Sequence, residues 1–318
     1  MRILVLGGTG FIGRHAAAAL LARGHDVVIG TRRPKRARQT LPEPLRSSAL
    51  RETHLESLTT RYVWQPLLAD VDVVLNCVGI LRERGSETYD RVQHMAPAAL
   101  AHACERLGLR LVHVSALGLR EEAPSRFLRS KWLAERAIAR SGADYSLVRP
   151  SLLDGEGGFG ARWLRRVANW PVHFIPAQAR GRMAVLQVTD LADALVTLCE
   201  GRNRPDLREV ELGGSMRRTM AEHLVALRTR PGPALRVSLP GPLALLASAV
   251  CDVLHFSPYS FANLELMRRD NLPLMNVLQA LIGRAPAAVG RELPKQRPAY
   301  AFAAMPTGHE TPVPPNPQ

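Results

Sequence analysis

The sequence predicts an α/β fold, in which a doubly wound parallel sheet forms a Rossmann domain and a small, mostly helical region forms a C-terminal cap. Short runs of residues are apolar throughout, which is typical of strands buried on both faces of a sheet. These runs alternate with helical patterns, and such alternation indicates a parallel sheet. A glycine-rich turn directly follows the first run, where a strand would lead into a helix.

The strands of the sheet are expected in the first half of the chain, at 2–6, 26–29, 71–78, 110–115 and 145–148. The alanines and leucines of 14–23 have helical spacing. Two more short strands, 185–188 and 209–212, are expected to return to the same sheet, and a helix is expected over 161–170. From Pro231 onward the pattern is helical and interrupted by prolines.

The residue pattern changes after the fifth strand, and this change divides the chain into two units. We expect 1–150 and 176–230 to form the Rossmann domain, and 151–175 and 231–293 to form the cap. The proline-rich end, 294–318, is expected to be disordered.

The composition limits the classes of protein that are possible. Of 318 residues, 46% are hydrophobic, so a sizeable core can form. There are 42 Lys and Arg against 28 Asp and Glu, a formal net charge of +14, and the only lysines are Lys35, Lys131 and Lys295. A coding bias toward arginine is the favoured explanation, although the balance also suits phosphates or an anionic membrane surface.

The cysteines and the N-terminus predict a cytoplasmic protein. Four isolated cysteines among apolar neighbours are expected to be free thiols in a reducing compartment: Cys77, Cys104, Cys199 and Cys251. The N-terminus has no signal-peptide pattern, and the longest apolar run, 242–251, is too short to span a bilayer. No metal site is expected, because His54, His94 and His113 lack the spacing of a ligand set.

The glycine pattern of the first turn predicts a dinucleotide site. Gly7 would permit the tight turn, Gly10 would let the backbone approach a pyrophosphate, and Gly13 would let the helix pack closely. The phosphates would lie at the helix N-terminus, where free N–H groups favour anions. An ordinary strand–helix turn is the alternative. The expected cofactor residues here are Gly7, Thr9, Gly10, Phe11, Ile12 and Gly13.

The end of the second strand favours NADP(H) over NAD(H). An acidic residue there would hold the ribose 2′-hydroxyl of NAD, but the sequence continues with Thr31, Arg32 and Arg33. Guanidinium groups bind phosphate in bidentate fashion, so Arg32 and Arg33 are expected to hold a 2′-phosphate. A solvated basic loop is the alternative. Nucleic acid fits poorly, because no aromatic residues interleave the arginines.

Further motifs carry a family resemblance. They are Asn-Cys-Val-Gly-Ile at 76–80, Val-His-Val-Ser-Ala at 112–116, Val-Arg-Pro-Ser at 148–151, Phe-x-x-Ser-Lys at 127–131 and Gln-Val-Thr-Asp-Leu-Ala at 187–192. With the glycine turn, the chain resembles the extended and atypical short-chain dehydrogenase/reductases. Within them it is similar to the branch of the nucleotide-binding accessory subunit of respiratory complex I and its bacterial relatives. The resemblance implies further cofactor contacts from Cys77, Val78, Gly79, Lys131 and Pro150.

The resemblance also implies a catalytic Ser, Tyr and Lys, with one departure. Ser115 and Lys131 match, but Phe127 stands at the tyrosine position. A phenyl ring has no proton to donate, so the usual general acid is absent. Lys131 can still bond the nicotinamide ribose. Tyr145 falls in a predicted buried strand and is expected to be a core residue.

Three functions stay open. The first is an NADP(H)-dependent oxidoreductase acting on a small apolar or quinone-like substrate. The second is a non-catalytic NADP(H)-binding redox sensor or assembly factor. A sugar-nucleotide epimerase or dehydratase fits less well, because it normally needs the tyrosine.

The apolar and aromatic residues of the C-terminal region predict that it contacts a substrate, a protein partner or a membrane. Residues 243–250 are apolar nearly all round, and aromatic residues cluster at 256–261. Any membrane contact would be peripheral and aided by the cationic face of Arg162, Arg165 and Arg166. Ordinary packing on the α/β domain is the alternative.

Overall fold

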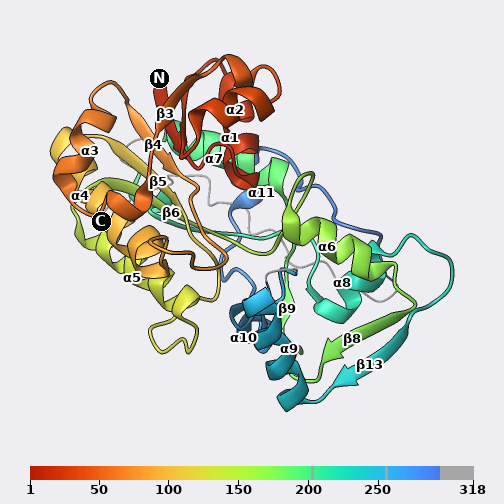
Figure 1. The fold of residues 1–318 in the computed structure, drawn as a ribbon. Helices are drawn as coiled ribbons and strands as arrows, with labels where there is room; N and C mark the ends of the chain where they lie inside the picture. Colours follow the sequence, from red (N-terminus) through yellow and green to blue (C-terminus); the bar gives the residue numbers. More distant parts are fainter. Residues whose placement is uncertain (202–203, 255–256, 294–318) are drawn as a thin grey trace, which may run out of the picture.

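The computed structural model describes residues 1–201, 204–254 and 257–293, and its centre is a seven-stranded sheet in the order β11-β6-β5-β4-β1-β2-β3 (Figure 1). Every pairing in this sheet is parallel. The strands are β1 (Arg2–Leu6), β2 (Asp26–Thr31), β3 (Ala49–Glu52), β4 (Val73–Asn76), β5 (Arg110–Val114), β6 (Asp144–Pro150) and β11 (Glu209–Leu212).

Helices cover both faces of the sheet. One face carries α1 (Phe11–Ala22), α7 (Val188–Glu200) and α11 (Leu278–Ile282), and the other carries α3 (Arg61–Leu68), α4 (Ala96–Leu107) and α5 (Arg126–Arg140). Side chains alternate between the two cores along each strand. In β1, Ile3 and Val5 join the α1 side, whereas Leu4 and Leu6 join the α4 side. The doubly wound Rossmann fold and the helical C-terminal region are confirmed.

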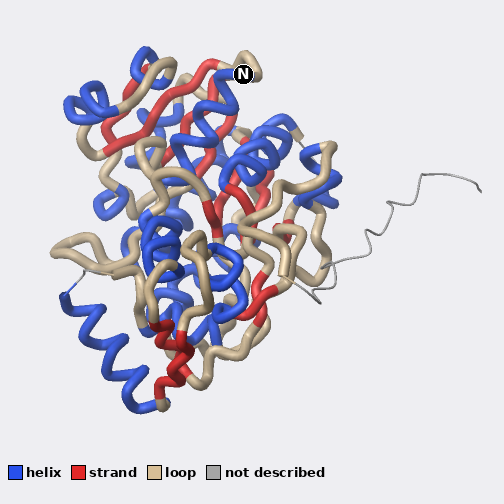
Figure 2. Tube along the Cα trace, turned by 90° about the vertical axis from the view of Figure 1, so that its right-hand side faces the viewer, coloured by secondary structure: helices blue, strands red, loops and turns tan. Residues whose placement is uncertain are grey.

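A second, smaller core lies outside the large sheet. Helix α6 (Phe159–Ala168) packs on α8 (Met220–Leu227). Beside them, β8 (Val172–Pro176) pairs in parallel with β13 (Leu235–Leu239), which leads into α9 (Gly241–Leu254) and α10 (Phe261–Met267). Two short pairs complete this part: β7 (Leu153–Asp154) with β10 (Leu186–Gln187), and β9 (Arg182–Met183) with β12 (Arg218–Thr219). In Figure 2, α9 runs along the outside of the molecule.

Two sequence-based expectations are wrong. Residues 185–188 do not return to the large sheet, since the chain enters α7 directly after Gln187 and leaves only the short β10 to pair with β7. The region after Pro231 is not wholly helical, because it contains β13. The prolines around β13 hide the two-residue alternation of its leucine, arginine, valine and serine residues, which is the period of a strand.

Other predicted features agree with the structure or lie outside it. Tyr145 is a buried residue of β6, as expected. Among the helices that the structure describes, none has the length and hydropathy of a membrane span. The tail at 294–318 falls outside the described residues, and the division into two domains stays a prediction.

Candidate active site

A cleft of about 760 Å³ lies at the carboxyl edge of β1, β2 and β4. Strand β1 is flanked by β2 on one side and β4 on the other, so the winding of the sheet reverses there. Ligands of open α/β sheets bind at such a reversal. The cleft is lined by Gly7, Thr9, Gly10, Gly30, Thr31, Arg32, Arg33, Arg36, Ala37, Thr40, Thr53, Leu55, Glu56, Cys77, Val78, Gly79, Ile80, Arg84, Glu87 and Val92.

The glycine turn forms one wall of the cleft. Gly7 has a φ of +71°, a left-handed conformation that favours glycine. A β-carbon on Gly13 would collide with the carbonyl oxygen of Gly7, so glycine is needed for α1 to start this close to the turn. Gly10 is the N-cap of α1, and the first turn of the helix holds no acidic side chain. The free N–H groups of this turn therefore suit a phosphate, and the residues fit a bound dinucleotide.

The end of β2 carries arginines and no carboxylate. Thr31 is buried, and its hydroxyl accepts a hydrogen bond from the backbone N–H of Arg33. Arg32 is engaged in an ion pair with Glu87. Among the described residues, no carboxylate pairs with Arg33 or Arg36, and both line the cleft. Free positive charge at this end therefore comes from Arg33 and Arg36 more than from Arg32.

The turn after β4 is held by a buried amide. The Asn76 side-chain oxygen accepts a hydrogen bond from the backbone N–H of Val78, 3.1 Å away. Its amide nitrogen lies 3.1 Å from Nδ1 of His113. Burial lowers the pKa of His113 to about 3, with the nearby charge of Lys131 acting in the same direction, so the ring stays neutral and can accept from Asn76. These bonds fix the turn of Cys77, Val78 and Gly79 against the cleft.

Lys131 reaches this turn from α5. A β-carbon placed on Gly79 would lie 3.7 Å from Lys131 Nζ and 3.6 Å from Gln93 Oε1. Burial lowers the pKa of Lys131 to about 8, although the charge of Glu135 opposes that shift. The Gln93 oxygen is buried and has no hydrogen-bond partner among the described residues. An ammonium and an amide therefore converge on the Gly79 end of the cleft.

Ser115 and Phe127 stand at the other two positions to which the family resemblance assigns catalysis. The backbone N–H of Ser115 donates to Val148 O at 2.7 Å, while its hydroxyl is buried without a partner in the described part of the chain. The Phe127 ring lies 5.8 Å from Lys131 Nζ and packs edge-on against Tyr89, with ring centroids 5.6 Å apart.

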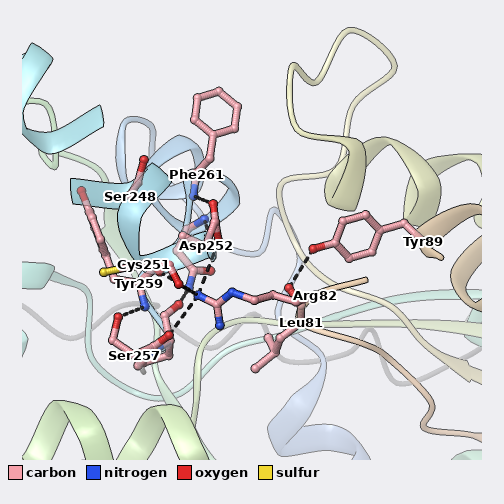
Figure 3. Close-up of polar contacts among 12 residues, drawn as sticks. Leu81, Arg82, Tyr89, Ser248, Cys251, Asp252, Ser257, Tyr259 and Phe261 are labelled. Carbon is pink, nitrogen blue, oxygen red and sulfur yellow. Dashed lines mark hydrogen bonds and ion pairs between the residues drawn. The ribbon is translucent and has the colours of Figure 1, made fainter. Parts of the chain in front are cut away.

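Although the Tyr89 ring packs against Phe127, its hydroxyl is engaged with the backbone. This hydroxyl donates to Leu81 O at 2.8 Å, as Figure 3 shows. Burial also raises the pKa of this phenol, so it is not primed to exchange a proton.

The structure brings most of the predicted cofactor residues to one cleft. Its walls include Gly7, Thr9, Gly10, Arg32, Arg33, Cys77, Val78 and Gly79. The first turn of α1 contains Phe11, Ile12 and Gly13. Pro150 ends β6 as a buried residue and is not part of the cleft wall. Sequence reasoning missed Gln93, Glu87 and Arg84, which come from the segment between β4 and α4 and carry no recognisable motif.

The burial of the thiols is unequal. All four cysteines are free thiols; three are buried, and Cys77 is partly buried at the cleft. Burial raises the pKa of the Cys77 thiol well above its usual range. A thiolate nucleophile at this position is therefore disfavoured.

Fold, glycine turn and cleft together define a Rossmann-type dinucleotide-binding protein. The family model for the NAD dependent epimerase/dehydratase family matches residues 3–213, so the chain belongs to that family. The expected resemblance to extended short-chain dehydrogenase/reductases is confirmed.

Two curated relatives show which kinds of protein in this family the chain is similar to. Ceramide reductase of Caulobacter vibrioides is 28% identical over 259 residues, which are 79% of this chain and 77% of that protein. NADH dehydrogenase [ubiquinone] 1 alpha subcomplex subunit 9 of Dictyostelium discoideum is 26% identical over 198 residues, 62% of this chain. The match spans 54% of that subunit's length. The expected similarity to this complex I branch is confirmed.

Solved structures support the fold. A nucleoside-diphosphate-sugar epimerase from Staphylococcus aureus aligns with a TM-score of 0.66 at 18% identity, over 91% of this chain and 98% of that one. UDP-glucose 4-epimerase from Thermotoga maritima aligns with a TM-score of 0.62 at 14% identity, over 91% and 94% of the two chains. At these identities the likeness establishes the shared architecture.

Proposed function

We propose that the protein is an NADP(H)-dependent reductase that acts on the carbonyl group of an apolar, lipid-like or quinone-like substrate. The observation that carries this proposal is the convergence of the Lys131 ammonium and the Gln93 amide on the Gly79 end of the cleft. Lys131 has a lowered pKa, and the buried Ser115 hydroxyl has no hydrogen-bond partner among the described residues. Buried polar groups without partners are costly in a folded protein, and such groups cluster where a ligand is to be bound.

The preference for NADP(H) over NAD(H) rests on Arg33 and Arg36. Both line the cleft beside β2, and no acidic residue ends that strand. A 2′-phosphate could accept charge-assisted hydrogen bonds from either guanidinium group. Arg32 already forms an ion pair with Glu87, so we expect it to contribute less than Arg33 and Arg36 to the preference for NADP(H).

The chain's own residues supply a route for the proton. Bound NADPH would provide a hydride for the carbonyl carbon. The Ser115 hydroxyl would hold the carbonyl oxygen, and Lys131 would hold a proton at Nζ for that oxygen. Transfer of this proton would complete the alcohol, with NADP⁺ as the other product. A pKa of about 8 suits a donor that works near neutral pH, and Phe127 cannot take this role.

The apolar character of the substrate rests on the wall beyond Gly79. Ile80 lines the cleft there, Leu81 is largely exposed, and the rings of Phe127 and Tyr89 pack together nearby. A mostly apolar wall with a few polar groups is usual for a small-molecule site. The relative from Caulobacter vibrioides is a reductase of ceramide by name, and that name supports a lipid substrate here.

A substrate panel tests the proposal. NADPH oxidation is followed at the nicotinamide absorbance band with quinones, long-chain ketones and ketone precursors of ceramide, and with sugar nucleotides as the comparison. We expect oxidation with a member of the apolar group and none with sugar nucleotides. Oxidation of NADPH by sugar nucleotides alone would overturn the proposal and favour a reductase of sugar nucleotides.

A second candidate is a non-catalytic NADP(H)-binding sensor or assembly factor. Phe127 favours it, because the family's usual proton donor is missing. The complex I subunits among the relatives also support a protein partner. Tight NADPH binding with no oxidation across the panel would favour this function over the reductase. In either case, three buried free cysteines support a reducing, cytoplasmic compartment.

A further inference from the structure

Helix α9 packs with its small residues inward and its large ones outward. Its buried positions are Ala244, Ser248 and Cys251, which follow helical spacing along one stripe. The outer side chains of Leu246 and Val253 are 62% and 74% exposed. A surface helix of a water-soluble domain normally turns its apolar stripe toward the core. The large side chains of α9 are therefore exposed and can contact another molecule.

The β8–β13 pair that precedes α9 continues the same apolar surface. Its register sets Leu235 opposite Val172 and Val237 opposite Phe174, and paired residues point to the same face. Leu235 is 65% exposed and Phe174 is 54% exposed. The opposite face carries His173, which is buried. Leu235 and Phe174 thus expose an apolar face of the pair, while the opposite face is buried at His173 and exposed at Arg236.

Polar bonds at the C-terminal end of α9 hold the helix on the molecule. Arg82 Nη2 donates to the carbonyl oxygens of Cys251 at 2.8 Å, Ser257 at 3.0 Å and Tyr259 at 3.2 Å (Figure 3). Asp252, the one charged residue of α9, lies 3.4 Å from Arg82 and accepts from the backbone N–H of the first residue of α10. The helix therefore has a fixed position that does not depend on its outer leucines and valines.

Positive charge borders this surface. Arg236 is exposed on β13, and Arg180 donates to the carbonyl oxygen of Ala177, whose own N–H bonds to Leu239 just before α9. Arg268 is the C-cap residue of α10, the helix that packs on α9. In the part of the chain that the structure describes, none of Arg180, Arg236 and Arg268 pairs with a carboxylate. An apolar face with a cationic border is complementary to anionic lipid headgroups.

We propose that α9 and the apolar face of the β8–β13 pair form a docking surface for an anionic membrane. The large side chains would enter the boundary between headgroups and acyl chains, while the bordering arginines would contact the headgroups. A second copy of the chain fits less well, because two such faces would bring the same arginines together. The sequence at 294–318 fits less well too, since its charged side chains are Lys295, Arg297 and Glu310, with no excess of acid. The proposal does not depend on the reductase activity.

Vesicle flotation of the full chain tests the docking surface. The probes are vesicles of phosphatidylcholine alone and of phosphatidylcholine mixed with phosphatidylglycerol, at low and high salt. The test variant is Leu246→Glu with Val253→Glu. Its control is Tyr62→Glu with Val63→Glu, which adds the same charge at exposed positions on α3. NADPH affinity and circular dichroism of both variants report whether the fold is kept.

We expect the unmodified protein and the α3 control to float with the mixed vesicles at low salt, and to bind less at high salt. The α9 variant should bind ~10-fold or more weakly while keeping its NADPH affinity. Equal flotation of the two variants would overturn the proposal, and so would no flotation with either vesicle. Light scattering distinguishes a further outcome, in which the unmodified protein and the α3 control are dimers and the α9 variant is a monomer. That result would assign the surface to a second copy of the chain.

Discussion

At its β1–β2 end the cleft is built from backbone N–H groups and arginines, whereas at its β4–α5 end it is built from side chains of separate elements. The glycine end keeps every position that a dinucleotide site needs, including the left-handed Gly7 and the close approach at Gly13. The other end keeps Ser115 and Lys131 but has Phe127 in place of the proton donor. The comparison shows that the residues suited to holding a dinucleotide are present, while the family's usual proton donor is replaced by Phe127.

The largest expected effect is at the glycine end, where Gly10→Val should abolish NADPH binding. The φ of Gly10 is −79°, which valine can adopt, but a β-carbon there would lie 3.1 Å from the Gly7 carbonyl oxygen, so circular dichroism checks that the variant is folded. Its side chain would occupy volume that a pyrophosphate needs. Calorimetric titration with NADPH checks this.

A matched control is Gly160→Ala, since a β-carbon there meets nothing within 4 Å. This control should bind NADPH as the unmodified protein does. Unchanged affinity in the Gly10 variant would mean that the turn is only structural.

At the other end, Lys131→Met should lower turnover by ~10²–10⁴-fold, the usual contribution of a positioned proton donor. The unmodified protein should lose activity as the pH rises through about 8, because Lys131 must be protonated to donate. Below that pH the rate should level off. A pH–rate profile measures both effects. An unchanged profile in Lys131→Met would show that Lys131 does not donate the proton.

The arginines should set the choice of cofactor with a smaller effect. Arg33→Ala with Arg36→Ala removes charge-assisted hydrogen bonds worth about 1.5–3 kcal/mol each, so NADPH binding should weaken ~10-fold or more. NADH binding should change little. Arg32→Ala is the comparison, and it should have a smaller effect because Glu87 already pairs with Arg32. Equal affinities of the unmodified protein for NADPH and NADH, measured by calorimetry, would contradict this assignment.

The smallest expected effect is that of Phe127→Tyr. If Lys131 supplies the proton, an added phenol should change turnover by no more than a few-fold. Steady-state kinetics with the apolar substrate measure this change. A rise of ~10²-fold or more would show that the unmodified site lacks a competent donor and would favour the non-catalytic function.

The two ends also differ in how far the sequence predicts them. Gly7, Gly10 and Gly13 act through backbone geometry over a few neighbouring residues, so their spacing alone indicates the turn. Gln93 and Glu87 reach the cleft only because the segment after β4 folds back over it, and no local pattern indicates that path.

Helix α9 shows the same limit. Its composition predicts burial against protein or lipid, but a helix that is apolar nearly all round does not reveal which side faces the body. That choice depends on Arg82, a residue far away in the sequence, which fixes the end of the helix.

Label transfer tests the central claim, that this cleft reduces a carbonyl group, most directly. NADPH carrying deuterium at the transferable position is incubated with the protein and the active apolar ketone, and the product is analysed by mass spectrometry. The account predicts deuterium on the former carbonyl carbon, with label transfer strongly reduced in Lys131→Met under conditions that saturate the cofactor site. Bound NADPH with no labelled alcohol from any ketone of the panel would contradict it.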